Sequence, residues 1–354
     1  MTPTLDLLRP GPRTSLQDLG RIGWRAMGIP VAGAMDRIGL GLANALVGNP
    51  PGTGCLELTL SGPLLRVAAE SVRIALAGPA RISLTKTTGE RRTLAPDRSW
   101  RLERGDLLEI GPINGSLVAY LAVEGGFAIA PLLGSLSTHL AAGLGPLGGR
   151  TLEAGPLPLC RDNAEPGPER RLTRPLPYGD GPIRLVPGPQ ADAFTPDALA
   201  TLLSSCYQVG TRSDRMGMRL EGPKLRHRGQ ADIVSDGIVA GCLQVPGDGS
   251  PILLLADHQT TGGYAKIATA ISADLPRLGR ALPGDRLEFR AVTVAEAEAV
   301  RRAQERAMQD CLDSLAPVEE NGRIDLAALY RAELISGAVT GDEEPVAPPS
   351  AGTI

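Results

Sequence analysis

Short runs in which apolar and polar residues alternate fill much of the chain, and they predict a mainly β protein. A two-residue period places one set of side chains on a buried face of a strand and the other set in solvent. The 44 Gly and 31 Pro residues separate these runs, as turn-forming residues do. Pro251–Ala256 is apolar throughout, which is typical of a strand buried on both faces. The other segments for which we expect strands are Leu5–Leu8, Leu56–Val67, Val72–Leu76, Ile82–Leu84, Leu107–Ile110, Leu117–Val123 and Ile183–Val186.

Helical periodicity is confined to a few segments. We expect Asp36 to cap a helix from Arg37 to Val47, which ends before Gly48. Gly39 and Gly41 weaken this helix, which indicates close packing against a neighbour. Further helices are expected at Pro196–Ser204, from a Thr293/Glu296 capping box to about Leu315, and at Ile324–Ile335.

The chain divides into two similar blocks followed by a C-terminal extension. We expect halves of one domain at residues 1–163 and 176–292, joined by a charged, proline-bearing linker at 164–175. Residues 293–336 would hold the C-terminal helices, and residues 337–354 have the composition of a disordered tail. ERGDLLEI resembles LPGDRLEF, and GIPVAGAMD resembles GIVAGCLQ, which suggests a duplicated domain. Chance similarity between glycine-rich turns is the alternative.

Composition narrows the range of functions. A net charge of −3 and only ten aromatic residues (two Trp, five Tyr, three Phe) argue against binding to nucleic acid or to an acidic membrane surface. No run of about 18 apolar residues indicates a transmembrane helix, and the first residues do not resemble a signal peptide. The five cysteines are scattered and lack C-x-x-C spacing, so we expect reduced thiols in a cytoplasmic protein.

The densest group of candidate functional residues lies between Ser213 and Lys266. Ser213, Asp214 and Arg215 are consecutive, and Gln244 lies in a glycine-rich turn. The predicted buried strand is followed directly by Asp257, His258, Gln259, Thr260, Thr261 and Tyr264. Polar residues on a loop fixed by a buried strand commonly form a site. The alternative is that these residues merely form turns.

Each of these residue types has a chemical use. The guanidinium of Arg215 can bind a carboxylate or phosphate in a bidentate manner. Asp257 and His258 are candidates for proton transfer, and with Arg215 and Asp214 they make up the candidate catalytic group. A loop histidine can equally be a solvated side chain. Substrate contacts are expected from Ser213, Gln244, Gln259, Thr260, Thr261 and Tyr264, of which the two glutamines could hydrogen-bond an amide ring.

A second group of candidates lies near the N-terminus. Gln17, Asp18 and Arg21 place an amide, a carboxylate and a guanidinium within five residues. They are candidates for substrate binding, or Asp18 and Arg21 form a local ion pair that holds a turn. Asp36 and Asn49 are also candidates, with helix-terminus roles as the alternative for both.

The sequence lacks the motifs of several common catalytic and cofactor-binding sites. The chain lacks a G-x-x-x-x-G-K-[ST] phosphate loop and a G-x-S-x-G nucleophile elbow. No pair of histidines has the spacing of a zinc site, so we expect no metal. No M-K-M biotin attachment sequence is present, so any biotin would be carried by a partner.

Several motifs resemble those of the second allophanate-hydrolase-subunit family. They are QDLGR, Met35-Asp36, Leu42-Ala43-Asn44, Gly48-Asn49, SDRMGMRLEG, GCLQVPGDGSPI and ADHQTTGGY, spread from about Arg13 to Val292. This family includes the C-type component of 5-oxoprolinase, KipA-type proteins and the carboxyltransferase part of urea carboxylase. The resemblance implies duplicated cyclophilin-like β-barrel domains with short helices and a C-terminal helix.

The resemblance also implies a function. The motifs are closest to the C-type component of an ATP-dependent 5-oxoprolinase, which converts 5-oxo-L-proline to L-glutamate. Its partners would be a B-type (KipI-like) subunit and an A-type (LamB/YcsF-like) subunit, with ATP and magnesium held by this chain or shared with a partner. The alternatives are a biotin-dependent carboxyltransferase acting on urea or another amide, and a KipA-like regulator without catalytic activity. In each case we expect the chain to be inactive alone.

Overall fold

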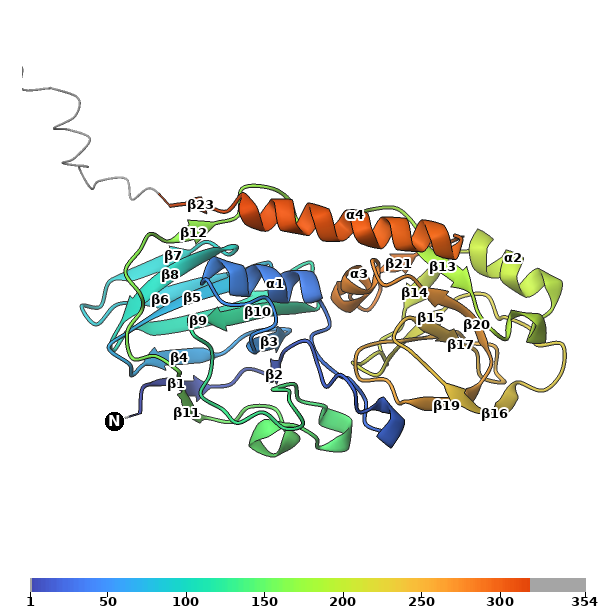
Figure 1. The fold of residues 1–354 in the computed structure, drawn as a ribbon, viewed down its shortest axis with the longest axis horizontal. Coiled ribbons are helices and arrows are strands. Elements are labelled where there is room, and N and C mark those ends of the chain that lie inside the picture. The colour runs from blue at the N-terminus through green and yellow to red at the C-terminus, as the bar shows by residue number, and fades with distance from the viewer. Residues whose placement is uncertain (1, 319–354) are drawn as a thin grey trace, which may run out of the picture. The chain divides into compact units, whose positions relative to one another are not determined.

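The computed structural model describes residues 2–318, and it is mainly β with few helices, as expected (Figure 1). The expected helix at 324–335 and the expected tail at 337–354 lie outside the described residues. Within residues 2–318, no helix has both the length and the apolar character needed to cross a membrane. The five cysteines are free thiols, and Cys55, Cys242 and Cys311 are buried.

The first half contains two sheets whose facing sides enclose an apolar core. One sheet has the order β11-β1-β4-β9-β6-β7, and the other has the order β2-β3-β10-β5-β8-β12-β23. Side chains such as Leu7, Leu56 and Leu121 fill the space between the sheets. The strands are β1 (Thr4–Arg9), β2 (Arg13–Gln17), β3 (Cys55–Thr59), β4 (Leu64–Val67), β5 (Ser71–Ala77), β6 (Ala80–Thr85), β7 (Arg91–Leu94), β8 (Arg98–Glu103), β9 (Leu107–Ile113), β10 (Val118–Val123), β11 (Gly155–Pro158), β12 (Arg170–Arg171) and the C-terminal β23 (Ala316–Pro317).

Helix α1 (Arg37–Leu46) covers the outer face of the second of these sheets. It packs on β10 and β5. The predicted cap is confirmed, because a side-chain oxygen of Asp36 accepts hydrogen bonds from Ile38 N (3.0 Å) and Gly39 N (3.1 Å). The expected close packing is also present, since a Cβ at Gly39 would lie 3.0 Å from the Tyr120 ring.

The second half is built around one nearly closed barrel sheet. Its order is β21-β14-β15-β18-β17-β20-β13-β22, and its two edge strands are separated in the chain only by Glu288. A separate two-stranded sheet pairs β16 with β19. The strands are β13 (Ile183–Pro187), β14 (Tyr207–Val209), β15 (Gly217–Glu221), β16 (Asp232–Gly237), β17 (Cys242–Gln244), β18 (Ile252–Leu254), β19 (Thr261–Tyr264), β20 (Lys266–Ala270), β21 (Arg286–Leu287) and β22 (Phe289–Ala291). The helices of this half are α2 (Pro196–Ser204) and α3 (Leu275–Arg280), with a short 3-10 turn at Ala191–Ala193. The first half of the chain has 3-10 turns at Arg25–Met27, Leu140–Ala142 and Pro146–Gly149.

A second apolar core joins the two halves. It includes Leu42 and Tyr120 from the first half and Leu243 and Ile267 from the barrel. Met1–Pro317 accordingly forms one compact unit. The junction is tight, because a Cβ built on Gly279 of α3 would lie only 2.1 Å from the backbone oxygen of Met35.

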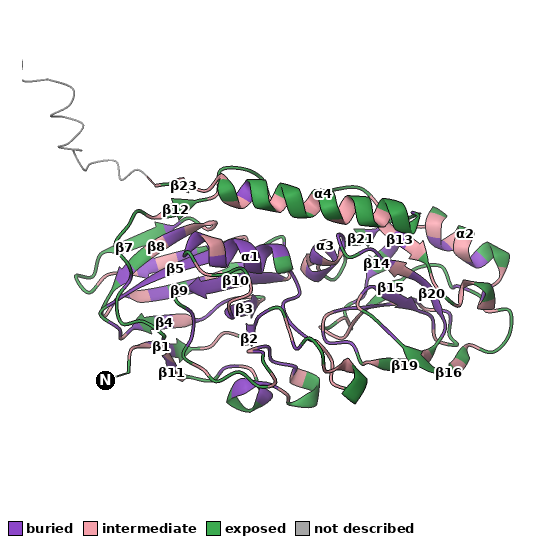
Figure 2. Cartoon of the chain, in the orientation of Figure 1, coloured by how far each residue is buried: buried purple, intermediate pink, exposed green. Residues whose placement is uncertain are grey.

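Helix α4 (Val294–Asp313) runs across both halves (Figure 1). The predicted Thr293/Glu296 capping box is confirmed. Most of the helix is exposed or half-buried (Figure 2), but Met308 and Leu312 pack against the shared core. Gln304 donates hydrogen bonds to the backbone oxygens of Pro177 (3.1 Å) and Ala273 (2.8 Å), which ties the helix to the second half.

One of the two suspected repeats builds the same turn twice. In ERGD, Asp106 N donates to Glu103 O (3.0 Å) and the Asp106 carboxylate accepts from Glu103 N (2.9 Å). In LPGD, Asp285 makes the corresponding bonds to Leu282 at 3.0 and 2.8 Å. The other pair is not equivalent, since GIPVAGAMD forms a loop leading to α1 and GIVAGCLQ runs from the end of β16 into β17.

Candidate functional site at the junction of the two halves

Two neighbouring strands of the barrel bring Arg215 and Asp257 together. β15 and β18 are antiparallel, with Gly217 opposite Leu254. The ladder continues past the strand ends, because Asp257 N donates to Arg215 O at 2.8 Å. The two side chains therefore emerge at one edge of the barrel, facing the first half.

The first half contributes Glu57 to this edge. Glu57 lies in β3 between Ser15 of β2 and Tyr120 of β10 in the same cross-strand row. The hydroxyl of Tyr120 donates to Glu57 Oε2 at 2.6 Å, and Met35 N donates to the same oxygen at 2.9 Å. The carboxylate is thereby oriented toward the second half, with its other oxygen on Arg215.

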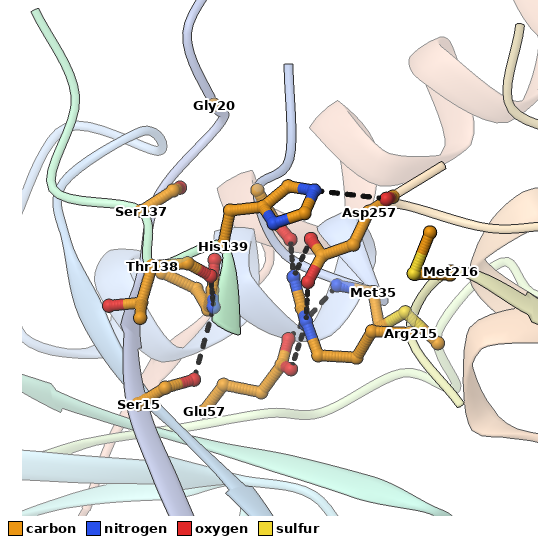
Figure 3. A network of polar contacts seen from close by, with 12 residues as sticks. Ser15, Gly20, Met35, Glu57, Ser137, Thr138, His139, Arg215, Met216 and Asp257 are labelled. Carbon is orange, nitrogen blue, oxygen red and sulfur yellow. Dashed lines mark hydrogen bonds and ion pairs between the residues drawn. The ribbon is translucent and has the colours of Figure 1, made fainter. Parts of the chain in front are cut away.

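Arg215 bridges the halves through a buried ion-pair cluster (Figure 3). Its Nε and Nη2 donate to the two oxygens of Asp257, both at 2.9 Å, and Nη1 donates to Glu57. Nη2 also donates to Gly33 O at 2.6 Å. Burial lowers the pKa of the Arg215 guanidinium, but the charges of Glu57 and Asp257 outweigh this effect and raise it overall. Arg215 therefore stays charged, and these bonds use four of its five N–H donors.

A cavity of about 290 Å³ adjoins this cluster and is called here the smaller cavity. Its charged lining consists of Glu57, Asp214, Asp257, Arg13 and Arg215. Ser15, Met35 and Ser213 also line it.

Ser213 and Asp214 at this cavity also hold the turn before β15. The Ser213 hydroxyl donates to Gly210 O at 2.7 Å. Asp214 Oδ1 accepts from Met216 N at 2.8 Å and from Gly217 N at 3.1 Å. Among the described residues, Oδ2 of Asp214 makes no hydrogen bond.

A second polar group lies apart from the smaller cavity and contains Gln17, Asp18 and Arg21. Asp18 accepts hydrogen bonds from the hydroxyls of Ser135 (2.6 Å) and Ser137 (2.5 Å), and Leu136 N also donates to it at 2.7 Å. Gln17 donates to Thr138 O at 2.9 Å. The predicted Asp18–Arg21 ion pair is wrong for the described structure, because Arg21 instead donates to Ser137 O.

Arg21 is fully buried with incomplete hydrogen bonding. Its Nε and Nη1 have no partner in the described part of the chain. Burial lowers the pKa of its guanidinium, and the charges of Asp18 and Asp257 oppose that effect. None of Gln17, Asp18 and Arg21 belongs to the described lining of the smaller cavity.

Two histidines lie near Asp257 in different settings. Nδ1 of His139 accepts a hydrogen bond from Ala142 N (3.1 Å), so Nε2 carries the proton and donates to Asp257 O at 3.1 Å. His258 is buried, and burial lowers the pKa of its imidazole below the ordinary 6.5. His258 lines a different cavity, of about 620 Å³, which is called here the larger cavity.

The remaining predicted substrate contacts lie away from the smaller cavity. Gln244 is buried beneath β19 and donates weakly to Tyr264 O at 3.4 Å. Thr261 and Tyr264 are exposed on β19, and Gln259 is exposed at the preceding turn, where Thr260 is half-buried. The structure thus brings Ser213, Asp214, Arg215 and Asp257 together and leaves these residues apart.

Asp36 and Asn49 have structural roles at the two ends of α1. Besides capping the helix, Asp36 accepts from the Tyr178 hydroxyl at 2.6 Å and from Arg280 at 3.4 Å, which adds a link between the halves. Asn49 donates to Val123 O at 2.8 Å and accepts from Gly125 N at 2.8 Å. The helix-terminus alternative therefore describes both residues.

Comparison with known proteins identifies the family. A family model described as carboxyltransferase domain, subdomain A and B, matches residues 27–291. The chain belongs to this family.

It is 34% identical over 307 residues to the C-type component of 5-oxoprolinase from Escherichia coli (strain K12), covering 85% of this chain and 96% of that protein. It is 33% identical over 312 residues to the corresponding 5-oxoprolinase component from Haemophilus influenzae, covering 85% and 95%. The crystal structure of the K. lactis urea amidolyase has a TM-score of 0.78 at 26% identity, covering 91% of this chain and 21% of that one.

In this member of the carboxyltransferase family, sequence reasoning missed Glu57, Tyr120 and His139. Glu57 alternates with Leu56 and Leu58, so the pattern indicated a solvated position. Its face is buried because α1 and the second half pack over it. One sequence signal could have identified Glu57. Tyr120 also interrupts an apolar strand, so the two polar side chains could pair across neighbouring strands.

Proposed function

We propose that this chain is the C-type component of an ATP-dependent 5-oxoprolinase that opens 5-oxo-L-proline to L-glutamate. The observation that carries the proposal is the nearly full-length similarity to the C-type 5-oxoprolinase component of E. coli. The activity would be an ATP-dependent lactam hydrolysis that requires a B-type and an A-type partner. The chain would be inactive alone, in the cytoplasm.

The smaller cavity suits a small polar ring. Its volume of about 290 Å³ is at the low end of small-molecule sites. Arg13 at its edge is exposed and has no ion pair within residues 2–318, so its guanidinium can bind the substrate carboxylate. The Ser15 hydroxyl can hydrogen-bond the lactam amide.

Asp214 is the best-placed base in this cavity. Two backbone N–H groups fix its Oδ1, and Oδ2 is free to accept a proton from an attacking water. Asp257 and Glu57 are less suited, because Arg215, Tyr120 and Met35 N already bind their oxygens. Arg215 is then a positioning residue, which revises its expected role as a substrate clamp.

ATP supplies the phosphoryl group that activates the lactam oxygen when it is bound. The smaller cavity does not suit a polyphosphate, because three carboxylates line it against two guanidinium groups. The nucleotide would therefore be held elsewhere on this chain or by a partner.

The test is reconstitution with candidate A-type and B-type partners. We expect ATP-dependent formation of glutamate from 5-oxoproline only when all three proteins are present. Asp214→Asn should lower kcat by about 10²–10⁴-fold without preventing assembly. Asp248→Asn is the matched control, because Asp248 holds a similar turn through Ser250 N outside the cavity. An assembled complex that forms no glutamate would contradict the proposal.

A second candidate is a biotin-dependent carboxyltransferase. The similarity of its fold to the K. lactis urea amidolyase, over 91% of this chain, favours it. Biotin would be carried by a partner, and the substrate would be urea or another amide. Transfer of labelled CO₂ from a carboxylated biotin carrier to urea would support this alternative. A stable complex without either activity would favour a KipA-like regulator.

A further inference from the structure

The larger cavity lies between the halves under α4 and has no role in the proposed hydrolysis. Its volume of about 620 Å³ is within the range of small-molecule sites. It adjoins the smaller cavity at Met35, which lines both. Most of its wall comes from the loop before α1, α1 itself, the segment after β18, α3 and α4, and Pro51, Ala240 and Ser272 complete it.

The charge of this cavity is opposite to that of the smaller one. Its ionisable lining is Arg25, Arg37, Arg301 and His258 against a single acid, Glu305. Burial holds the pKa of His258 low, so the positive charge comes from the three guanidinium groups. Arg301 uses Nε to bind Glu305 at 2.7 Å, which leaves the other two arginines without a carboxylate among the described residues.

Arg37 on α1 and Arg301 on α4 line the same cavity. Helices α1 and α4 are in contact, and burial followed by the charge of Arg301 lowers the pKa of Arg37. The hydrogen bond that Arg37 donates to Leu19 O is long, at 3.5 Å. Two neighbouring cations with unused donors form a binding site for an anion, since Arg binds phosphate in a bidentate manner.

Most of the remaining lining is apolar, with Ser272, Gln304 and Gln309 as its uncharged polar residues. Ile38, Leu255, Leu275, Met308 and Leu312 form much of it. An inorganic ion would leave this surface without a partner, whereas a ligand with a flat or aliphatic body would cover it.

We propose that the larger cavity binds an organic phosphate whose phosphate groups contact Arg37 and Arg301 and whose body covers the apolar lining. The nucleotide required by the proposed function belongs to this class, and its identity as ATP rests on that function. A ligand bound here contacts α1, α4 and both halves, next to the smaller cavity. This position would bring a phosphoryl donor close to the lactam.

The first experiment measures binding of ATP to the full-length chain by calorimetry, without its partners. We expect ATP to bind more tightly than either pyrophosphate or adenosine. Arg37→Gln and Arg301→Gln should each weaken ATP binding roughly tenfold or more. Arg302→Gln is the matched control, because Arg302 is the next residue on α4, pairs with Glu298 and does not line this cavity. Thermal unfolding without ligand checks that each variant is folded.

Three results would overturn the inference. They are equal affinity for pyrophosphate and ATP, unchanged ATP binding by the folded double variant, and binding that Arg302→Gln weakens equally. If the chain alone binds no ATP, the reconstituted complex decides. An unchanged KM for ATP in the double variant overturns the inference, and a raised KM supports it. ATP binding without glutamate formation would instead remove the proposed function and leave the site intact.

Discussion

At the scale of single residues, Arg215 is the group on which the junction depends most. Its guanidinium forms ion pairs with two buried carboxylates that come from different halves of the chain. The cluster is connected to Tyr120 through Glu57, and burial together with the proximity of that carboxylate raises the pKa of the tyrosine far above its ordinary value. A buried pair of this kind is costly to break from one side, because the remaining charges lose their partner.

We expect Arg215→Ala to lower the free energy of unfolding by about 3–5 kcal/mol, since Glu57 and Asp257 would be left buried without a cation. Urea unfolding at neutral pH measures this change. Arg219→Ala, in exposed sequence nearby, should change stability by less than about 0.5 kcal/mol. A loss of less than about 1 kcal/mol for Arg215→Ala would show that the cluster does not hold the halves together.

His258 should make stability depend on pH. Burial lowers its folded pKa below the ordinary 6.5, so the unfolded chain binds the proton more readily. Its contribution is therefore complete above about pH 6.5 and is lost as the pH falls toward the folded pKa. We expect the free energy of unfolding to fall less between pH 7 and pH 5 in His258→Gln than in the original protein. Parallel curves for the two proteins would exclude His258 as the cause.

The sequence predicted Arg215 and Asp257 as members of a site but could not predict their pairing. They are separated by 42 residues, and their contact depends on the register of β15 with β18. Glu57 was missed because the alternation of apolar and polar residues identifies one buried face of a strand. It does not reveal that a second layer covers the opposite face. The row that contains Glu57 is buried by α1 and the second half, which no local pattern reveals.

At the scale of elements, α1 and α4 were predicted closely because their signals are local. The caps of Asp36 and Thr293 satisfy backbone N–H groups within three residues, so sequence alone identifies them. The order of the strands in the sheets was harder to predict from the sequence. Their strand order joins segments such as β2, β3 and β10, whose partners are fixed by long-range packing.

Helix α3 provides a test of the packing between elements. A Cβ on Gly279 would lie 2.1 Å from Met35 O, and a backbone oxygen cannot move as a side chain can. We expect Gly279→Ala to lower the free energy of unfolding by about 1–3 kcal/mol and to lower activity in the reconstituted complex, because Met35 lines both cavities. Gly229→Ala is the control, since a Cβ there meets no atom within 4 Å. Equal stability of the two variants would contradict the close approach.

At the scale of the whole described unit, the two halves share one turn and differ in how their sheets are arranged. The ERGD and LPGD turns are the same, yet one half is a pair of packed sheets and the other a nearly closed barrel. The shared core between them contains α1, the outer face of β10 and the barrel interior. The expected linker at 164–175 is part of the packed structure, because β12 within it pairs with β8 and β23.

This shared core predicts that the two halves unfold together. Trp100 lies in β8 of the first half, whereas Trp24 adjoins Arg25, which donates to Ile238 O of the second half. In a Trp24→Phe variant, tryptophan fluorescence therefore reports on the first half. Far-UV circular dichroism reports on strands and helices of both halves. Because removing either half would expose the core that α1 and the barrel share, we expect the two probes to give the same urea midpoint. Arg215→Ala should shift both midpoints equally if Arg215 stabilises the unit as a whole. A circular dichroism transition that persists after the fluorescence change is complete would show that the barrel is stable alone.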